Sequence, residues 1–405
     1  MSAVPTPDPL RFPYTNELRM PVIGLEAEFK VFVDDVEIVP EDYWRVPSGF
    51  IESPLLRRSS KSSQLPSGGA VYFDGGVLEV VTPVIELAPQ CTARAVRSLW
   101  EQIGFVRDQL DGWETRTGKR ARLQAFSCHF NISYEIPRAE RGRDRTIQKL
   151  ALLLMHLLPV PAIVTGANRA STGVGVRPRR DRIEITFDFT PDPALLAATT
   201  AVIVGIVRDV IAWPSYRVDE LAARGISTIA GLTPAKHATR NGWMARAEQF
   251  PRDPFAEGAD ARGWETTDER TLSLRELALE IATHFRESIR RVADPASERT
   301  LFAVLRGESP SLLDLDARPA AYDDIGRAVR WSSPMPRLSR SRYEQVFLRL
   351  GTLEPLRIEG ELLTPVGVKG WYHAAFRDDA GETRLLSIDQ ILDALALDSQ
   401  SLRAS

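Results

Sequence analysis

Four short segments of this chain carry acidic or imidazole side chains that alternate with apolar ones. The segments are GLEAEF (24–29), VLEVVT (77–82), SCHFNIS (127–133) and RIEITFD (182–188). Successive side chains of a strand point to opposite faces, so each segment, as a strand, presents its reactive groups on one face only. One sheet face would then hold several glutamates and one histidine, a ligand set suited to hard divalent cations.

The alternation within each segment separates a polar face from an apolar one. Glu26 and Glu28 share a face, and Glu79 stands between Val77 and Val81. In the third segment the polar face would hold Ser127, His129, Asn131 and Ser133, and the apolar row Phe126, Cys128, Phe130 and Ile132. In the fourth, the polar face would hold Arg182, Glu184, Thr186 and Asp188. A solvated strand face normally mixes in Lys and Thr, and Glu is a poor strand former, so we favour a common site over four ordinary half-buried strands.

The composition is that of a soluble globular protein. The chain has 405 residues, enough for one large domain or two smaller ones. A net charge of −3 gives no general attraction to nucleic acid or to an anionic membrane, so neither is an expected partner. We expect no signal peptide, and the two cysteines, Cys91 and Cys128, show no metal or redox spacing. The expected location is the cytoplasm.

One apolar stretch has the length of a membrane span. It runs from Pro193 to Trp213 and is interrupted by Arg208 and Asp209. Charges inside a bilayer are costly, and Asp192-Pro193 is typical of a helix start, so the stretch is predicted to be a buried core helix.

The remaining pattern supplies the elements that would position these residues. Residues 34–70 read as a long connection of the kind that forms lids or binding loops. Helical spacing predicts helices at about 92–111, 144–158, 272–292 and 337–350, and short strands at 357–387 turned at DDAGE. A change of character near 310–335 suggests a domain boundary.

Five ordered motifs resemble those of carboxylate–amine ligases of the glutamine synthetase-like superfamily, and most closely glutamate–cysteine ligases of the bacterial and plant type. The motifs are GLEAE, Glu79 in GGVLEVVTP, His129-x-Asn131-x-Ser133, RPRRDRIEIT and Asn241-x-Trp243-x-Ala245-Arg246. The resemblance covers about residues 20–290. It implies an α+β fold with a curved, mainly antiparallel sheet, helices on its apolar face, and a polar face that binds ATP. The expected organisation is a lead-in (1–20), a catalytic domain (21–310) and a small C-terminal α+β domain (311–405) of unassigned role.

The resemblance also implies roles for individual residues. The metal ligands for Mg²⁺ or Mn²⁺ would be Glu26, Glu28, Glu79, His129 and Glu184. Arg182 and Arg246 would act in catalysis, and the nucleotide or its phosphates would contact Asn131, Ser133, Arg177 and Arg180. Guanidinium groups suit phosphate and carboxylate because they bind both bidentately. The reaction implied is phosphorylation of a carboxylate by ATP, followed by attack of an amine on the acyl phosphate, with the γ-carboxyl of glutamate as the expected acid.

One position departs from the family pattern. The family often has arginine two residues beyond the last metal glutamate, where this chain has Thr186. Two alternatives therefore stay open: an amide hydrolase or deamidase that uses the same site, and a non-catalytic nucleotide- or metal-binding relative. The substrates are expected to be a small carboxylate and an amine, and the sequence also allows a homo-oligomer.

Overall fold

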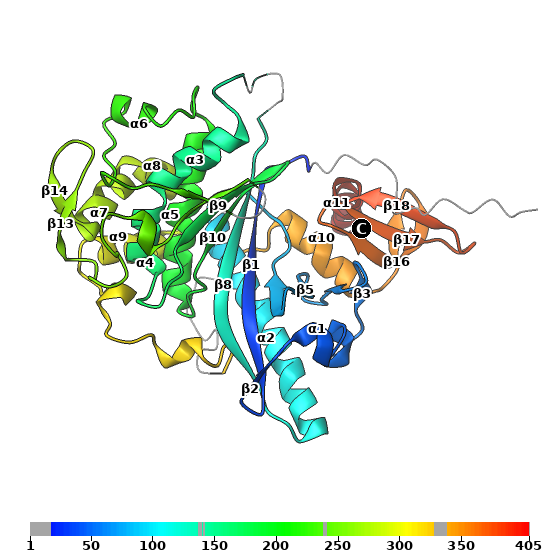
Figure 1. Ribbon diagram of the computed structural model, residues 1–405. Coiled ribbons are helices and arrows are strands. Elements are labelled where there is room, and N and C mark those ends of the chain that lie inside the picture. The colour runs from blue at the N-terminus through cyan, green and yellow to red at the C-terminus, as the bar shows by residue number, and fades with distance from the viewer. Residues whose placement is uncertain (1–17, 137–139, 141, 238–240, 328–337, 405) are drawn as a thin grey trace, which may run out of the picture.

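The computed structural model describes residues 18–136, 140, 142–237, 241–327 and 338–404. Within these ranges the chain is an α+β protein built around one large, twisted sheet of 16 strands (Figure 1). Strand order along its main path is β11-β12-β9-β10-β8-β1-β6-β5-β4-β3-β16-β17-β18. Every printed pairing is antiparallel except that of β3 with β16, so the expected mainly antiparallel sheet is confirmed.

The long central strands form where the sequence alternates. The strands before α2 are β1 (Val22–Val33), β2 (Val36–Ile38), β3 (Leu56–Arg57), β4 (Ser62–Gln64), β5 (Ala70–Asp74), β6 (Val77–Val81) and β7 (Ile85–Glu86). The strands that follow α2 are β8 (Ala121–Ser133), β9 (Val174–Pro178), β10 (Arg182–Phe187), β11 (Ala235–Lys236) and β12 (Trp243–Ala245). A separate hairpin pairs β13 (Arg262–Glu265) with β14 (Thr271–Ser273).

Two layers of helices lie on the apolar face of the sheet. The helices that contact its strands are α2 (Cys91–Thr117), α3 (Ile147–Leu157), α4 (Pro159–Gly166) and α5 (Pro193–Ile211). Behind them, α7 (Leu274–His284), α8 (Arg286–Val292) and α9 (Pro295–Leu305) pack on α4 and α5. The short helices α1 (Pro40–Tyr43) and α6 (Glu220–Ala223) lie in connections. Alternate residues of β1, among them Leu25 and Phe29, join Leu99, Ile103 and Val106 of α2 in one hydrophobic core. The helix expected at 272–292 is divided at Phe285, which ends α7 and precedes α8.

The candidate membrane span is a core helix in this structure. Helix α5 has the length and composition of a span, and the bent pair α3–α4 passes the same test as a unit. However, 78% of the apolar window of α5 is buried inside the protein, and it packs on α2, α4, α8 and α9. Asp192 caps its first turn by accepting hydrogen bonds from the backbone amides of Ala194 and Leu195. The prediction of a buried core helix is confirmed.

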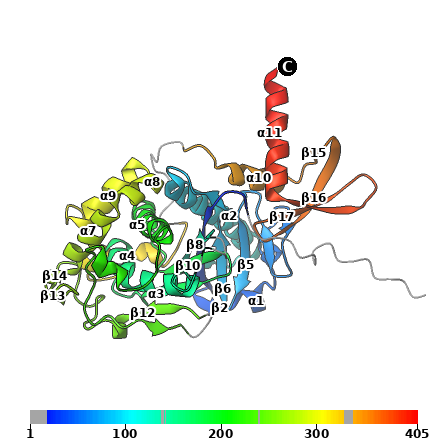
Figure 2. The ribbon, with the colours of Figure 1, turned by 90° about the horizontal axis from the view of Figure 1, so that it is seen from above.

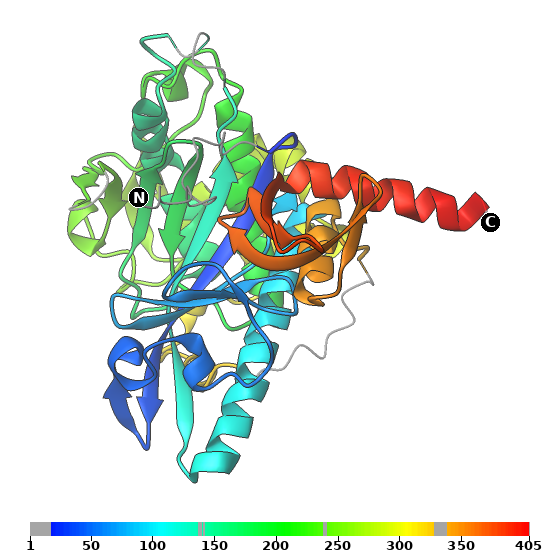
Figure 3. The same ribbon diagram turned by 90° about the vertical axis from the view of Figure 1, so that its right-hand side faces the viewer.

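The C-terminal region contains α10 (Arg342–Gly351), β15 (Leu356–Ile358), β16 (Glu361–Lys369), β17 (His373–Arg377), β18 (Thr383–Ser387) and α11 (Ile388–Ala404). It has a hydrophobic core of its own, which includes Tyr343, Phe347 and Phe376 and also takes in Leu56 and Val84 from the first part of the chain. Leu313, Tyr322 and Ile325 belong instead to the large core. Figures 2 and 3 show α11 projecting from this region.

The two regions are joined by a shared sheet and by a buried ion pair. Strand β16 pairs with β3 at Gly367 and Arg57, which continues the large sheet into the C-terminal strands. Arg97 of α2 contacts the fully buried carboxylate of Glu344 of α10, with Nη2 2.7 Å from Oε2. The C-terminal region is therefore fixed against the sheet that carries the predicted site.

Candidate active site

Strand pairing brings the predicted site residues into one strip across the polar face of the sheet. Glu26 of β1 lies opposite His129 of β8, and Glu28 lies opposite Ser127 of β8 and Glu79 of β6. One row further, Asn131 of β8 lies between Gly24 of β1 and Glu184 of β10. The five predicted metal ligands thus come from four neighbouring strands, as the alternation of the sequence required.

His129 lies between the two carboxylates of β1. Its Nδ1 is 3.0 Å from Oε2 of Glu26, and its Nε2 is 3.4 Å from Oε1 of Glu28. Burial opposes a charged imidazole, but the hydrogen bond with Glu26 and the charges of both glutamates outweigh it and raise the pKa of His129. Burial likewise acts to raise the pKa of Glu26, and the hydrogen bond and charge of His129 reverse this, so the pKa of Glu26 is lowered.

Glu184 is held by two arginines, Arg177 of β9 and Arg179 of the turn between β9 and β10. Arg179 donates from Nε to Oε2 of Glu184 at 2.7 Å, and Arg177 contacts Oε1 through its own Nε. The Glu184 side chain is only 1% exposed. Burial raises its pKa even though Arg177 acts in the opposite direction. Arg177 also reaches His129, with Nη2 3.2 Å from Nε2, so it spans the centre of the strip.

Glu79 marks the part of the strip where negative charge exceeds positive charge. Burial raises the pKa of Glu79 to about 9, and the nearby charges of Glu26 and Glu28 add to the rise. A hydrogen bond with Tyr72, which lies opposite Glu79 on β5, only partly compensates. A buried carboxylate among like charges is stable as an anion when a cation joins it.

The excess of negative charge around Glu79 and the carboxylate oxygens present there fit a hard divalent cation. Glu28 and Glu79 are the best-placed carboxylates for it. In the part of the chain that the structure describes, no three acidic, histidine or cysteine side chains are already arranged around a common point for a metal. The carboxylates contact protein cations instead, since His129 joins Glu26 with Glu28 and Arg177 contacts Glu184. The metal role of the five residues stays a prediction.

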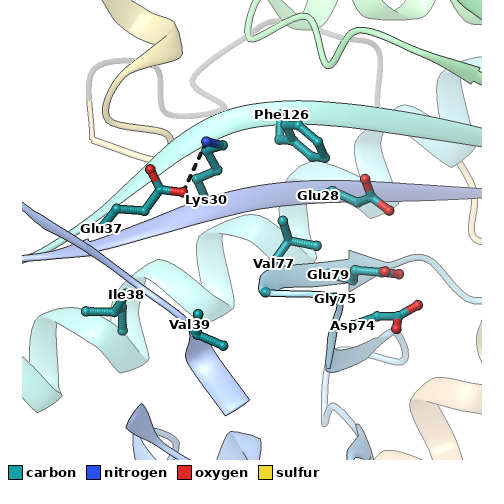
Figure 4. A pocket seen from close by; sticks show the side chains of 11 residues that line it. Glu28, Lys30, Glu37, Ile38, Val39, Asp74, Gly75, Val77, Glu79 and Phe126 are labelled. Carbon is teal, nitrogen blue, oxygen red and sulfur yellow. Dashed lines mark ion pairs between the residues drawn. The ribbon is translucent and has the colours of Figure 1, made fainter. Parts of the chain in front are cut away.

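A first pocket opens at the acidic end of the strip. It has a volume of about 510 Å³ and is lined by Glu28, Lys30, Glu37, Ile38, Val39, Asp74, Gly75, Gly76, Val77, Glu79 and Phe126 (Figure 4). The Gly75-Gly76 turn joins β5 to β6 with positive φ at both positions, a conformation that glycine adopts without strain. Lys30 is paired with Glu37 at 3.0 Å, so this pair borders the pocket opposite the Glu28 and Glu79 carboxylates.

The predicted position of Phe126 in the apolar row of β8 is wrong. Alternation places Phe126 on the buried face, but its side chain is 49% exposed. The pairing of β1 with β8 shifts between Glu28 and Phe29, which lie opposite Ser127 and Ala125. Phe126 is the extra residue of this β-bulge, and a bulge turns a side chain away from the face that strict alternation assigns to it.

A second, larger pocket of about 1230 Å³ opens at the other end of the strip. Its wall includes Glu26, Tyr72, Asn131, Ser133, Arg180 and Arg182 from the sheet, Arg58 from the loop after β3, and Trp371 and Tyr372 from the C-terminal region. Nε of Arg182 donates to Oδ1 of Asn131 at 2.8 Å, and its Nη1 lies 3.1 Å from Oδ1 of Asp181. The hydroxyl of Ser133 accepts from the amide of Val22 at 2.9 Å.

The structure brings most, but not all, of the predicted residues together. The strip and its two pockets contain Glu26, Glu28, Glu79, His129, Glu184, Asn131, Ser133, Arg177, Arg180 and Arg182. Arg246 is exposed after β12, which is separated from β1 by β9, β10 and β8, and it lines neither pocket. Its role also stays a prediction.

Several pocket residues escaped the sequence analysis. Tyr72 alternates with Asp74 before a Gly-Gly turn, which is a hairpin signal that would have placed it beside Glu79. Arg58, Trp371 and Tyr372 gave no comparable signal, because their position depends on the pairing of β3 with a strand 300 residues later in the chain.

Comparisons with known proteins give a limited result. No family model matches the chain, and no curated protein matches it in sequence. Among solved structures, it resembles a chain of the crystal structure of the complex between the prokaryotic ubiquitin-like protein Pup and its ligase PafA. The two chains share 12% sequence identity, 93% of each is covered, and the TM-score is 0.48. A likeness of this size assigns neither a substrate nor a residue role.

Proposed function

We propose that this protein is an ATP-dependent carboxylate–amine ligase of the glutamine synthetase-like type, with an acyl-phosphate intermediate. One observation carries the proposal: a single charged strip connects two pockets of opposite character. The end at Glu28 and Glu79 is mainly acidic, with its one lining lysine, Lys30, paired with Glu37, and the end at Arg182 and Arg58 is rich in arginine. This arrangement suits transfer of a phosphoryl group from a metal-bound nucleotide in one pocket to an acid in the other.

The 510 Å³ pocket is the proposed nucleotide site. Phe126 offers an exposed aromatic face beside Glu28, and every nucleobase can stack on such a face. Glu28 and Glu79, together with His129, would hold Mg²⁺ or Mn²⁺. The bound metal would neutralise the phosphates during an in-line transfer.

The 1230 Å³ pocket is the proposed site of the acid and the amine. In the first step a carboxylate oxygen attacks the γ-phosphorus of ATP, and ADP leaves. In the second step the amine nitrogen attacks the acyl carbon, and phosphate leaves with the oxygen that the carboxylate supplied. Glu26, which lines this pocket beside His129, is placed to take the proton that the amine loses.

Arg177 supplies positive charge at the place where the family pattern has an arginine and this chain has Thr186. Thr186 lies opposite both His129 and Gly175, and its side chain packs against Gly175. Arg177 comes from the neighbouring strand β9 and crosses to His129 at 3.2 Å. We propose that it stabilises the transferred phosphoryl group, which would make Thr186 compatible with ligase chemistry.

The decisive test follows isotopic oxygen during turnover. The protein is supplied with ATP, Mg²⁺, a panel of amines, and carboxylic acids labelled with ¹⁸O in the carboxyl group. We expect ADP, an amide, and inorganic phosphate that carries one ¹⁸O atom. Glu79→Gln should reduce the turnover at least 100-fold, whereas Glu265→Gln, an exposed strand glutamate in β13, should have little effect.

Other outcomes identify the alternatives. Release of an acid and an amine from an amide without ADP would indicate a hydrolase. Tight binding of ATP with no turnover on any amine would indicate a non-catalytic relative. Phosphate without label, formed together with amide, would exclude the acyl phosphate. Small-molecule substrates and a cytoplasmic location remain part of the proposal, and the latter suits two buried, unpaired thiols.

A further inference from the structure

The C-terminal region reaches the central strands through a series of hydrogen bonds in the larger pocket. Tyr372 lies in the turn between β16 and β17, and its hydroxyl donates to Oδ2 of Asp181 at 2.6 Å. The other oxygen of Asp181, Oδ1, accepts from Nη1 of Arg182 at 3.1 Å. Arg182 in turn donates from Nε to Oδ1 of Asn131 on β8 at 2.8 Å. All four residues line this pocket, so the series links the C-terminal turn with the predicted catalytic arginine.

Two acceptors fix the guanidinium of Arg182 and leave part of it available. A guanidinium is planar and carries its five N–H groups in a rigid fork, so acceptors at both Nε and Nη1 allow it little rotation. Within the described ranges, Nη2 of Arg182 has no hydrogen bond, and 35% of the side chain is exposed. Its two N–H groups can therefore serve an anionic ligand in the pocket.

Asp181 depends on Tyr372 for a fixed orientation. It lies in the turn between β9 and β10, where Arg180 before it is exposed and Arg182 follows it. An ion pair between partly exposed side chains orders them only weakly, because each side chain loses rotamer freedom in forming it. A hydrogen bond from a hydroxyl to a carboxylate is short and roughly twice as strong as one between neutral groups. The bond from Tyr372 therefore selects the orientation of Asp181 in which Oδ1 is left for Arg182.

Tyr372 is itself held by the fold of the C-terminal region. Its carbonyl accepts from the amide of Ile388, the first residue of α11, at 2.8 Å. The neighbouring Trp371 packs on Phe347 of α10, with ring centres 5.0 Å apart. Burial, and after it the hydrogen bond with Asp181, raise the pKa of Tyr372, so the hydroxyl keeps its proton and acts as the donor. The place of this hydroxyl thus depends on how the C-terminal region docks on the sheet.

We propose that Tyr372 and Asp181 are positioning residues, which hold the guanidinium of Arg182 for an anionic group in the larger pocket. The C-terminal region thereby has a role in the reaction, which is to orient an arginine of the central strands. That the anion is the acyl phosphate rests on the proposed function, whereas the orientation of Arg182 for an anion does not.

Binding of inorganic phosphate to the whole protein tests the proposal without turnover. Calorimetry measures the affinity of the wild type, Arg182→Met, Tyr372→Phe and the variant with both changes. We expect Arg182→Met to bind phosphate about ten-fold more weakly than the wild type, the usual loss when a hydrogen bond to a charged group is removed. Tyr372→Phe, which removes only the hydroxyl, should weaken binding by about three- to ten-fold. It should have no further effect in the Arg182→Met background, because its influence passes through Arg182. Its effect should also vanish in an Asp181→Ala background, a comparison that cancels the loss of the Asp181 charge.

Tyr43→Phe is the matched control, since Tyr43 loses the same atom, is exposed and lines neither pocket. Its hydroxyl accepts from Lys119 at 2.6 Å, so this variant also removes one hydrogen bond, and it should bind phosphate as the wild type does. Equal melting temperatures would show that each variant is folded. A folded Tyr372→Phe variant with wild-type affinity would overturn the proposal. So would an effect of Tyr372→Phe that is undiminished in the Arg182→Met background, or a wild type that binds phosphate no more tightly than Arg182→Met.

The same variants separate this inference from the proposed function. Phosphate binding that depends on both Arg182 and Tyr372, without amide formation from any labelled acid, would retain the positioning role and reject the ligase. Amide formation with labelled phosphate at the same rate in Tyr372→Phe and in the wild type would retain the ligase and reject the positioning role.

Discussion

At the scale of single residues, the site is defined by which charges have partners. His129 joins Glu26 and Glu28, and Glu184 has Arg177 and Arg179, whereas burial, together with the charges of Glu26 and Glu28, raises the pKa of Glu79. These differences give each glutamate of the strip its own environment. The sequence of the four strand segments does not predict these environments, because the pKa of a side chain depends on burial and on neighbours from other strands.

Phe126 provides a direct test of the proposed nucleotide pocket. Replacement of Phe126 by Ala should weaken ATP binding about 5- to 100-fold, since stacking of a base on an aromatic ring contributes about 1–3 kcal/mol. Binding of tripolyphosphate, which has no base, should not change. Calorimetry with both ligands measures this. Leu362→Ala, which removes an exposed apolar side chain from β16, serves as the control and should leave both affinities unchanged. An equal loss for ATP and tripolyphosphate would contradict base stacking.

Asp188 should impose a pH dependence on stability. It follows β10, and burial raises its pKa to about 7, against about 4 in an unfolded chain. The folded state therefore retains a proton between pH 4 and 7 that the unfolded state releases. The contribution of Asp188 to the free energy of unfolding is full below about pH 4, falls with a slope of up to about 1.4 kcal/mol per pH unit, and levels off above pH 7.

Denaturant titrations from pH 4 to 8 would measure this slope. Asp188→Asn should make the profile less steep over this range. Asp192→Asn, at the exposed N-cap of α5 where asparagine is also a good cap, should leave the profile as it is. The same pH profile in Asp188→Asn and the wild type would show that Asp188 ionises normally.

At the scale of elements, the strip depends on long strands kept in register by the helices behind them. Helix α5 is the central member of that layer, and it contacts α8 through Gly205. A Cβ atom at Gly205 would lie 2.6 Å from Cα of Ile289 and 2.9 Å from its amide nitrogen. The backbone of α8 cannot yield as a flexible side chain would, so the close approach of the two helices requires glycine.

Gly205→Ala should therefore destabilise the protein, by about 1–3 kcal/mol as is usual for overpacking in a core. Gly104→Ala is the opposite case, because Gly104 lies within α2 and a Cβ there meets nothing within 4 Å. It should stabilise the protein by about 0.5–1 kcal/mol through helix propensity. Chemical denaturation of both variants measures the contrast. Two shifts of the same sign would contradict the close contact of α5 with α8.

At the scale of the whole molecule, the two pockets depend on different parts of the chain. Among the residues that the structure describes, the lining of the proposed nucleotide pocket comes from residues 28 to 126, whereas the larger pocket also takes in Trp371 and Tyr372 of the C-terminal turn. The C-terminal region is held by Glu344, whose buried carboxylate accepts from Arg97 of α2 and from the amide of Ser341. Docking of this region should therefore affect one ligand and not the other.

Glu344→Gln should weaken this docking, because removal of one partner from a buried ion pair costs about 3–5 kcal/mol. We expect the variant to lose affinity for glutamate, the expected acid, while it retains ATP affinity, and to melt at a lower temperature. Glu354→Gln, which changes an exposed pair with Arg349, should alter neither affinity nor stability. Parallel losses of ATP and glutamate binding would show that the two pockets are not independent.

The sequence by itself determined the faces of the central strands and the residues that they share. Alternation has a period of two in any strand, so Glu26, Glu28, His129 and Glu184 were assigned to one face before any pairing was known. The apolar content of α5 similarly identified a core helix. These features are local, and local patterns are sufficient to predict them.

Only the tertiary structure decided which side chains from different strands contact one another. A single extra residue in β8 exposed Phe126, and pairing of β9 with β10 placed Arg177 opposite Glu184, from where it reaches His129. The pairing of β3 with β16 placed Trp371 on Arg58 and formed the larger pocket. Contacts of this kind depend on register and on strands distant in sequence, and no periodicity within one segment specifies them.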